Sequence, residues 1–156
     1  MLNQLQRVLA SFQKHDVKYV VIGGIATILH GVPRSTFDLD ILIEPSESNA
    51  QRLLAALRDA EIGTSSLTDT KDLLAHEITI FKDYVRIDVQ TRTPGVEFHA
   101  AWDRKKTVEY NGQSFHILSL DDLIIAKRAA GRAIDLQDAD ALEALRDSSN
   151  RNRQKN

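Results

Sequence analysis

The stretch GGIATILHGVPRSTFDLDI, residues 23–41, ends one apolar run with two glycines and places two aspartates inside the next. Side chains of a strand alternate between its faces, so Asp38 and Asp40 share one face while Leu39 and Ile41 share the other. Two carboxylates this close repel each other, and a cation is needed to keep both ionised. Oxygen ligands suit Mg²⁺. The pattern favours a metal site; the alternative is a strand edge at which both aspartates are solvated.

The glycine pair before the two aspartates is a candidate phosphate-binding turn. KYVVIGG, residues 18–24, predicts a short buried strand, and IATILHG, residues 25–31, predicts a short helix. Free N–H groups at a helix N-terminus attract phosphate, and glycine lets a phosphate approach the backbone closely. Many strand-to-helix turns need glycine for geometry alone. Gly23 and Gly24 followed by two carboxylates nevertheless indicate a metal–triphosphate substrate.

A third carboxylate comes from YVRIDVQT, residues 84–91. Apolar and polar residues alternate through this stretch, which predicts a half-buried strand with Asp88 on its polar face. The alternative is an ordinary solvent-facing residue. If this strand lies beside residues 37–44, its aspartate joins the other two.

The remaining pattern predicts one α/β domain over residues 1–147, with a mixed sheet, flanking helices and a helical C-terminal end. Beyond the segments already named, we expect a polar loop at 61–70 and a disordered polar tail at 148–156. Helices are expected at 2–15, after Pro45, at 120–130 and at 135–146, and strands at 37–44, 76–81 and on either side of Asn111-Gly112.

Composition narrows the class of protein. The chain has 156 residues, 42% of them hydrophobic, and a net charge of −2, so no general attraction to nucleic acid is indicated. The absence of cysteine excludes disulfides and thiolate metal sites and is compatible with the cytoplasm, the compartment we expect. No apolar run is long enough to span a membrane.

The glycine pair, the spaced Asp-x-Asp and the later strand aspartate together resemble the minimal nucleotidyltransferases of the polymerase-β-like superfamily. The longer pattern GGIATILHGVPRSTFDLDILI and the C-terminal LSLDDLIIAKRAAGRAIDLQDADAL resemble the AbiEii-type, toxin–antitoxin-associated subgroup. The resemblance covers roughly residues 17–145. Many superfamily members have serine after the first glycine, where this chain has Gly24, so the phosphate contact would come from backbone or from Arg34, Ser35 or Thr36.

The resemblance implies transfer of a nucleotide monophosphate from an NTP to an acceptor hydroxyl, with release of pyrophosphate. Asp38 and Asp40 would hold two Mg²⁺ ions, or Mn²⁺ in their place, and Asp88 would complete the site where the hydroxyl is activated. The acceptor is left open among tRNA, a protein and a small molecule. A cognate toxin or antitoxin, or a second copy of the chain, is an expected partner.

Two cations are candidate nucleotide ligands. Arg34 precedes the Asp-x-Asp strand and suits phosphate oxygens, although a surface ion pair is the alternative. Lys127 continues the apolar stripe of the helix 120–130, so it lies in line with the core face. We expect it to reach phosphate or an active-site aspartate; the alternative is an ammonium that extends to water. Asp135 and Asp138, three residues apart on a helix, could make a second polar site, but together with Asp140 they are more typical of a solvated helix face.

A rival hypothesis keeps the fold without catalysis, as a regulatory binding module that pairs with a toxin or another protein. A degenerate copy often loses one aspartate of the site. All three are present here, which favours an enzyme.

Overall fold

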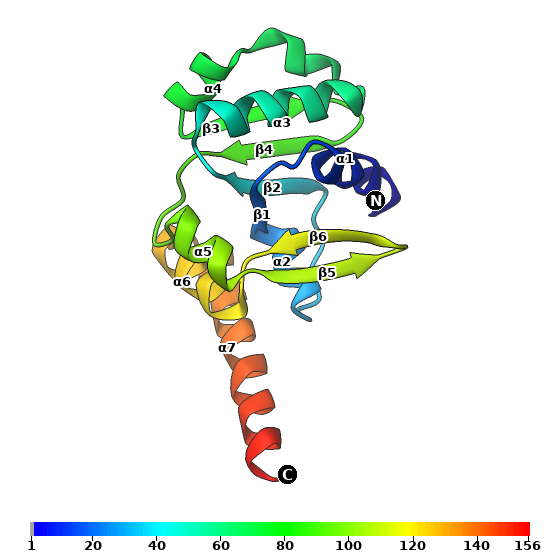
Figure 1. Cartoon of the computed structure of the whole chain (residues 1–156). Coiled ribbons are helices and arrows are strands. Elements are labelled where there is room, and N and C mark those ends of the chain that lie inside the picture. Colours follow the sequence, from blue (N-terminus) through cyan, green and yellow to red (C-terminus); the bar gives the residue numbers. More distant parts are fainter. Residues whose placement is uncertain (1) are drawn as a thin grey trace.

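The computed structural model describes residues 2–156, which build a mixed six-stranded sheet with helices packed around it (Figure 1). The strand order is β3-β4-β2-β1-β6-β5. Strands β2 and β4 are parallel, as are β1 and β6, and the other neighbours are antiparallel. The strands are β1 (Tyr19–Ile22), β2 (Asp38–Ile43), β3 (Ile78–Lys82), β4 (Arg86–Gln90), β5 (Lys106–Tyr110) and β6 (Gln113–Ile117). The predicted mixed α/β fold is confirmed.

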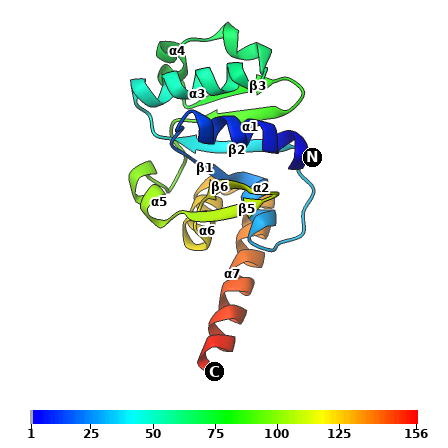
Figure 2. The ribbon, with the colours of Figure 1, turned by 45° about the vertical axis from the view of Figure 1, so that its right-hand side comes forward.

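The helices form two groups around the sheet. Helices α1 and α3 lie side by side across one part of it, and α6 packs against α7 below its other end (Figure 2). The short α2 connects β1 to the loop before β2. The helices are α1 (Leu2–Lys14), α2 (Gly23–Leu29), α3 (Glu47–Asp59), α4 (Thr70–Ala75), α5 (Phe98–Arg104), α6 (Leu120–Ala130) and α7 (Ala133–Gln154), with a 3₁₀ helix at Gly63–Leu67.

The alternation in β2 matches the prediction. Leu39 and Ile41 are fully buried in the core, whereas Asp38 and Asp40 on the opposite face are partly exposed. Burial of two large apolar side chains on one face fixes the register, because a slip of one residue would bury the aspartates instead. The core therefore determines which way the two carboxylates point.

Two short helices are absent from the sequence prediction. Helix α4 begins at Thr70 and is capped by Asp69, whose side chain accepts a hydrogen bond from the backbone N–H of Asp72. The 3₁₀ helix replaces half of the predicted loop. Helix α5 is capped by Glu97, which accepts from the N–H groups of His99 and Ala100. Both helices have seven residues or fewer, too short for a clear helical periodicity.

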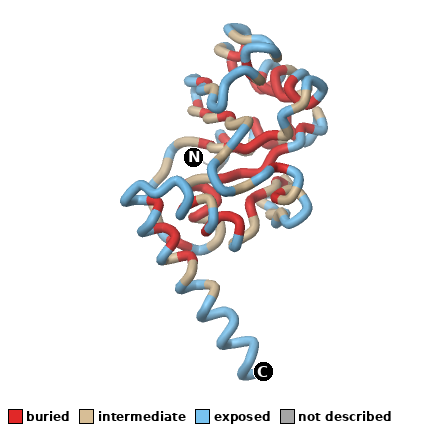
Figure 3. Tube along the Cα trace, turned by 90° about the vertical axis from the view of Figure 1, so that its left-hand side faces the viewer, coloured by how far each residue is buried: buried red, intermediate tan, exposed pale blue. Residues whose placement is uncertain are grey.

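The predicted disordered tail is corrected by the structure, because α7 continues through Gln154. Residues 133–154 contain no glycine or proline, so nothing in the sequence interrupts the helix. Its C-terminal part projects from the body of the molecule and is exposed on all sides (Figure 3). Among residues 2–156, no helix has both the length and the apolar composition to cross a membrane.

Candidate functional site

The three predicted aspartates meet on neighbouring strands. In the parallel pairing of β2 with β4, Asp40 is aligned with Asp88 and Asp38 is aligned with Arg86. Because aligned residues of a sheet point to the same face, the three carboxylates share one surface. Burial, followed by repulsion from Asp88 and then Asp38, raises the pKa of Asp40 to about 7. This carboxyl therefore binds a proton near neutral pH unless a cation neutralises its surroundings.

The glycine pair fits closely against the carboxylate side of the site. Gly23, the first residue of α2, has a φ of +69°, and a Cβ atom there would overlap Oδ2 of Asp40. A Cβ atom on Gly24 would lie 2.9 Å from Oγ1 of Thr36. Within α2, Thr27 donates a hydrogen bond to the Gly23 carbonyl at 2.9 Å. Both glycines are therefore required for close packing, whether or not a phosphate approaches them.

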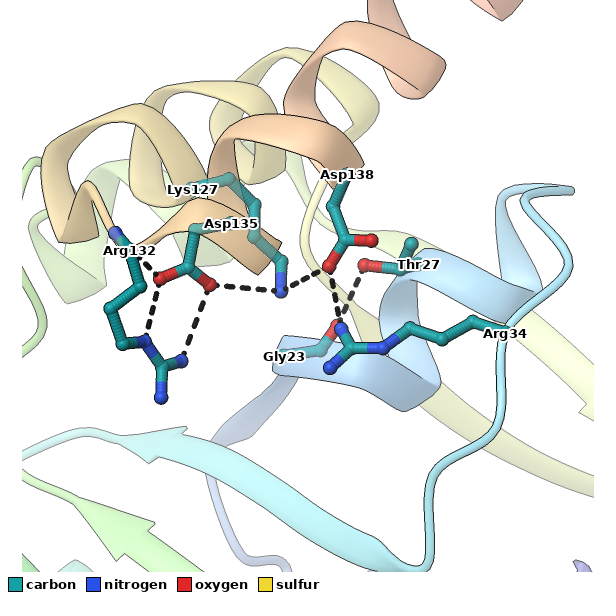
Figure 4. Close-up of polar contacts among 7 residues, drawn as sticks. All are labelled: Gly23, Thr27, Arg34, Lys127, Arg132, Asp135 and Asp138. Atoms are coloured by element: carbon teal, nitrogen blue, oxygen red, sulfur yellow. Dashed lines mark hydrogen bonds and ion pairs between the residues drawn. The ribbon is translucent and has the colours of Figure 1, made fainter.

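A chain of alternating charges borders the site on the α6–α7 side (Figure 4). The Lys127 side chain is only 6% exposed, and its Nζ lies 3.0 Å from Asp138 and 3.5 Å from Asp135. Arg34 donates to Asp138 at 2.6 Å, and Arg132 Nε donates to Asp135 at 2.7 Å. Each buried carboxylate is thus held between two cations. Lys127 therefore does not extend to water, but the acids that it reaches belong to α7 and are not the aspartates of β2 or β4 that were expected.

A hollow of about 110 Å³ lies between Asp40 and the chain of alternating charges. Asp40 and Gly23 line one side, while Lys127, Arg132 and Asp135 of the charge chain line the other. Lys127 acts on Asp40 by lowering its pKa, against the larger effects of burial and the neighbouring carboxylates. The complete lining is Ile22, Gly23, Asp40, Gln90, Thr93, Leu123, Ala126, Lys127, Ala130, Arg132 and Asp135.

Arg86 occupies the space beside the carboxylates. Its guanidinium donates to both oxygens of Asp88, at 2.9 and 3.2 Å, and lies 3.6 Å from Oδ2 of Asp38. Across residues 2–156, no three acidic or histidine side chains are already arranged as metal ligands. The three aspartates therefore share a face without forming a ready-made cage, and Arg86 holds one of them.

The sequence identified part of this arrangement and missed several of its charged members. Gly23, Asp40 and Lys127 line the hollow. The other predicted site residues, Gly24, Arg34, Thr36, Asp38 and Asp88, do not line it, and Arg34 pairs with Asp138 beside Lys127. Asp135 and Asp138, assigned to a solvated face, are 1% and 5% exposed, whereas Asp140 does lie at the surface. The other missed residues are Arg86 and Arg132. The signal for Arg86 was present in its position two residues before Asp88, on the same strand face.

Comparison with known families gives one decisive match. The model of the family described as "Nucleotidyltransferase of unknown function (DUF6036)" matches residues 1–150. The protein belongs to this family. This assignment supports the general class that the sequence pattern indicated. The AbiEii-type subgroup, which is a finer assignment, remains a prediction.

Solved structures share the fold of this DUF6036 member. An antigenic nucleotidyltransferase-like protein from Paracoccidioides brasiliensis aligns with a TM-score of 0.60 at 17% identity, covering 90% of this chain and 73% of its own. A candidate nucleotidyltransferase from Thermotoga maritima aligns with a TM-score of 0.55 at 16% identity, covering 96% and 92%. At these identities the likeness shows the fold alone. No curated protein matches the chain significantly.

Proposed function

We propose that this protein is a metal-dependent nucleotidyltransferase that moves a nucleotide monophosphate from an NTP to an acceptor hydroxyl. One observation carries the proposal: Asp38, Asp40 and Asp88 share one face of two paired parallel strands, beside the glycine turn that starts α2. Membership of a nucleotidyltransferase family supports the reaction class.

The donor set fits a hard divalent cation. The three carboxylates offer oxygen ligands only. Burial, followed by repulsion from Asp88 and then Asp38, raises the pKa of Asp40, and a bound cation would offset both effects. In the proposal, Asp38 and Asp40 hold Mg²⁺ ions, with Mn²⁺ as a substitute, and Asp88 completes a two-ion site. When bound, such ions stabilise the charge that develops on the attacking and leaving oxygens.

The cations of the charge chain are the proposed contacts for the triphosphate. Lys127 and Arg132 line the hollow opposite Asp40, and their positions are fixed because Asp135 and Asp138 hold them. A preorganised cation stabilises a phosphate without a further cost in side-chain entropy. Gly23, Gly24 and Thr36, which packs against Gly24, form the proposed opposite wall.

The transfer step follows from this placement. The acceptor hydroxyl gives its proton to the carboxylate of Asp88, and its oxygen forms a bond to the α-phosphorus. The bond from the α-phosphorus to the bridging α–β oxygen breaks, and pyrophosphate leaves with that oxygen. Asp88 belongs on the acceptor side because it lies on β4, one strand further from the glycine turn than Asp40.

Candidate acceptors remain tRNA, a protein and a small molecule, and a toxin or antitoxin partner or a second copy remains a proposed assembly. The chain retains all three aspartates, which favours the enzyme over the regulatory binding module. The reaction is proposed to occur in the cytoplasm.

The proposal is tested by incubating the protein with each α-³²P-labelled NTP and Mg²⁺ in a cell extract. We expect one macromolecule or small molecule to acquire label with wild-type protein and none with Asp40→Asn. Equal labelling by both proteins would refute the assignment of the site. Labelling from γ-³²P-NTP instead of the α-label would refute nucleotidyl transfer.

A further inference from the structure

Both oxygens of Asp88 already accept hydrogen bonds from one guanidinium. Arg86 Nε donates to Oδ1 at 2.9 Å and Nη2 donates to Oδ2 at 3.2 Å. This is the two-pronged geometry in which arginine binds carboxylates most strongly. The geometry of the strand keeps the two side chains side by side, because Arg86 and Asp88 lie two residues apart on β4 and share a face.

A divalent cation must compete with Arg86 for Asp88, because the guanidinium already uses one lone pair on each carboxylate oxygen. Mg²⁺ needs oxygen ligands at about 2.0–2.1 Å, and it would stand against the positive charge of the guanidinium. Asp40 is different: within the described part of the chain it has no ion-pair partner closer than 4.0 Å. The contact of Asp38 with Arg86 is longer, at 3.6 Å. The two cation positions of the proposed site are therefore unequal.

We infer that Arg86 makes the second cation position conditional on nucleotide: a single ion binds between Asp38 and Asp40, and the position at Asp88 opens only when a triphosphate draws Arg86 away. This inference rests on the proposed function. The Arg86 side chain is 38% exposed, so it can turn without unfolding its strand. Phosphate oxygens suit the guanidinium as well as a carboxylate does.

The inference fixes an order of assembly. The first ion binds between Asp38 and Asp40, nucleotide then binds, and Arg86 exchanges Asp88 for phosphate. Asp88 then becomes available to the second ion and the acceptor hydroxyl. In the absence of nucleotide, Arg86 continues to neutralise the charge of Asp88. If Arg86 only stabilised β4, its removal would lower stability without changing how many ions bind.

The test is a Mn²⁺ titration in which electron paramagnetic resonance measures free Mn²⁺, with and without an NTP analogue that has a methylene group between the α- and β-phosphorus atoms. We expect wild-type protein to bind one ion alone and two with the analogue. Arg86→Gln should bind two ions without the analogue, the second about tenfold or more tightly than wild type does, because the lost pair involves two charge-assisted hydrogen bonds.

Matched variants separate the possible outcomes. Arg92→Gln removes an exposed arginine that lies just after β4 and pairs with Glu77, and it should titrate like wild type. Arg86→Lys keeps the charge without the two-pronged geometry and should fall between wild type and Arg86→Gln; it also serves if Arg86→Gln fails to fold.

Two results would count against different claims. An unchanged number of bound ions in the Arg86 variants would overturn the inference and leave the proposed function standing. A wild-type protein that binds no Mn²⁺ even with the analogue, or an Asp40→Asn variant that binds as many ions as wild type, would refute the proposed function itself.

Discussion

Replacing Asp40 by asparagine should stabilise the metal-free protein at alkaline pH and have little effect in acid. Burial and two neighbouring carboxylates raise the pKa of Asp40 from 3.8 to about 7. Between these two values the native state binds a proton that the unfolded state has released. The free energy of unfolding of wild-type protein therefore falls as pH rises from about 4 to about 7. Asparagine has no proton to lose, so the variant avoids this penalty.

The size of the effect follows from the pKa shift. Each unit corresponds to about 1.4 kcal/mol, so a rise from 3.8 to about 7 gives a ceiling of about 4 kcal/mol above pH 7. Partial exposure of Asp40 lets solvent screen the repulsion, which lowers the expected gain to about 2–4 kcal/mol. This is a substantial part of the 5–15 kcal/mol that is usual for a domain.

Urea unfolding at pH 4.5 and pH 8 in EDTA measures this difference. We expect Asp40→Asn and wild type to have similar stabilities at pH 4.5 and to separate at pH 8, with Mg²⁺ restoring stability to wild type alone. Asp147→Asn, which removes an exposed acid of α7, is the control and should show no such separation. A variant that is less stable than wild type at pH 8 would refute the electrostatic account of the site.

The remaining predictions test other parts of the site. Asp38→Ala should abolish transfer with the fold intact, and Asp88→Asn should stop transfer while NTP binding stays measurable by calorimetry. Gly23→Ala should lower the free energy of unfolding by more than about 2 kcal/mol and weaken Mn²⁺ binding, because a left-handed φ costs about 1–2 kcal/mol and the new methyl overlaps Asp40. Gly112→Ala, at a φ of +77° with open space around it, is the matched control. It should lose only the stability of about 1–2 kcal/mol that the left-handed φ costs. Lys127→Met should destabilise by about 3 kcal/mol in urea and weaken NTP binding, because two buried carboxylates lose a shared cation; unchanged stability would contradict the charge chain.

The features of the site that depend on a single short stretch of sequence could be predicted. Strand alternation places Asp38 with Asp40 and marks Asp88 on a polar face, and both patterns hold because the core buries the intervening residues. The parallel pairing of β2 with β4 is a long-range feature that no local pattern contains. The sequence joins Asp88 to the first two aspartates only on the condition that the two strands are neighbours, and the structure shows that they are.

Buried charge could not be predicted in the same way. An acid on a helix is usually solvated. The three-residue spacing puts Asp138 on the same helix face as Asp135, but it does not show that this face is buried while Asp140 is exposed. The difference arises because α6 packs on α7 and brings Lys127 to one face of that helix. For the same reason Lys127→Met is expected to lose stability, because Lys127 is the cation that the two buried carboxylates share.

The most direct test of the central claim is a crystal structure of the protein with Mn²⁺ and the unreactive NTP analogue, in which anomalous scattering locates the ions. We expect anomalous peaks between Asp38 and Asp40 and at Asp88, with the triphosphate between the glycine turn and Lys127. Nucleotide bound elsewhere, for example in the pocket of about 520 Å³ that His30, Lys106 and Arg153 help to line, would contradict the proposed site.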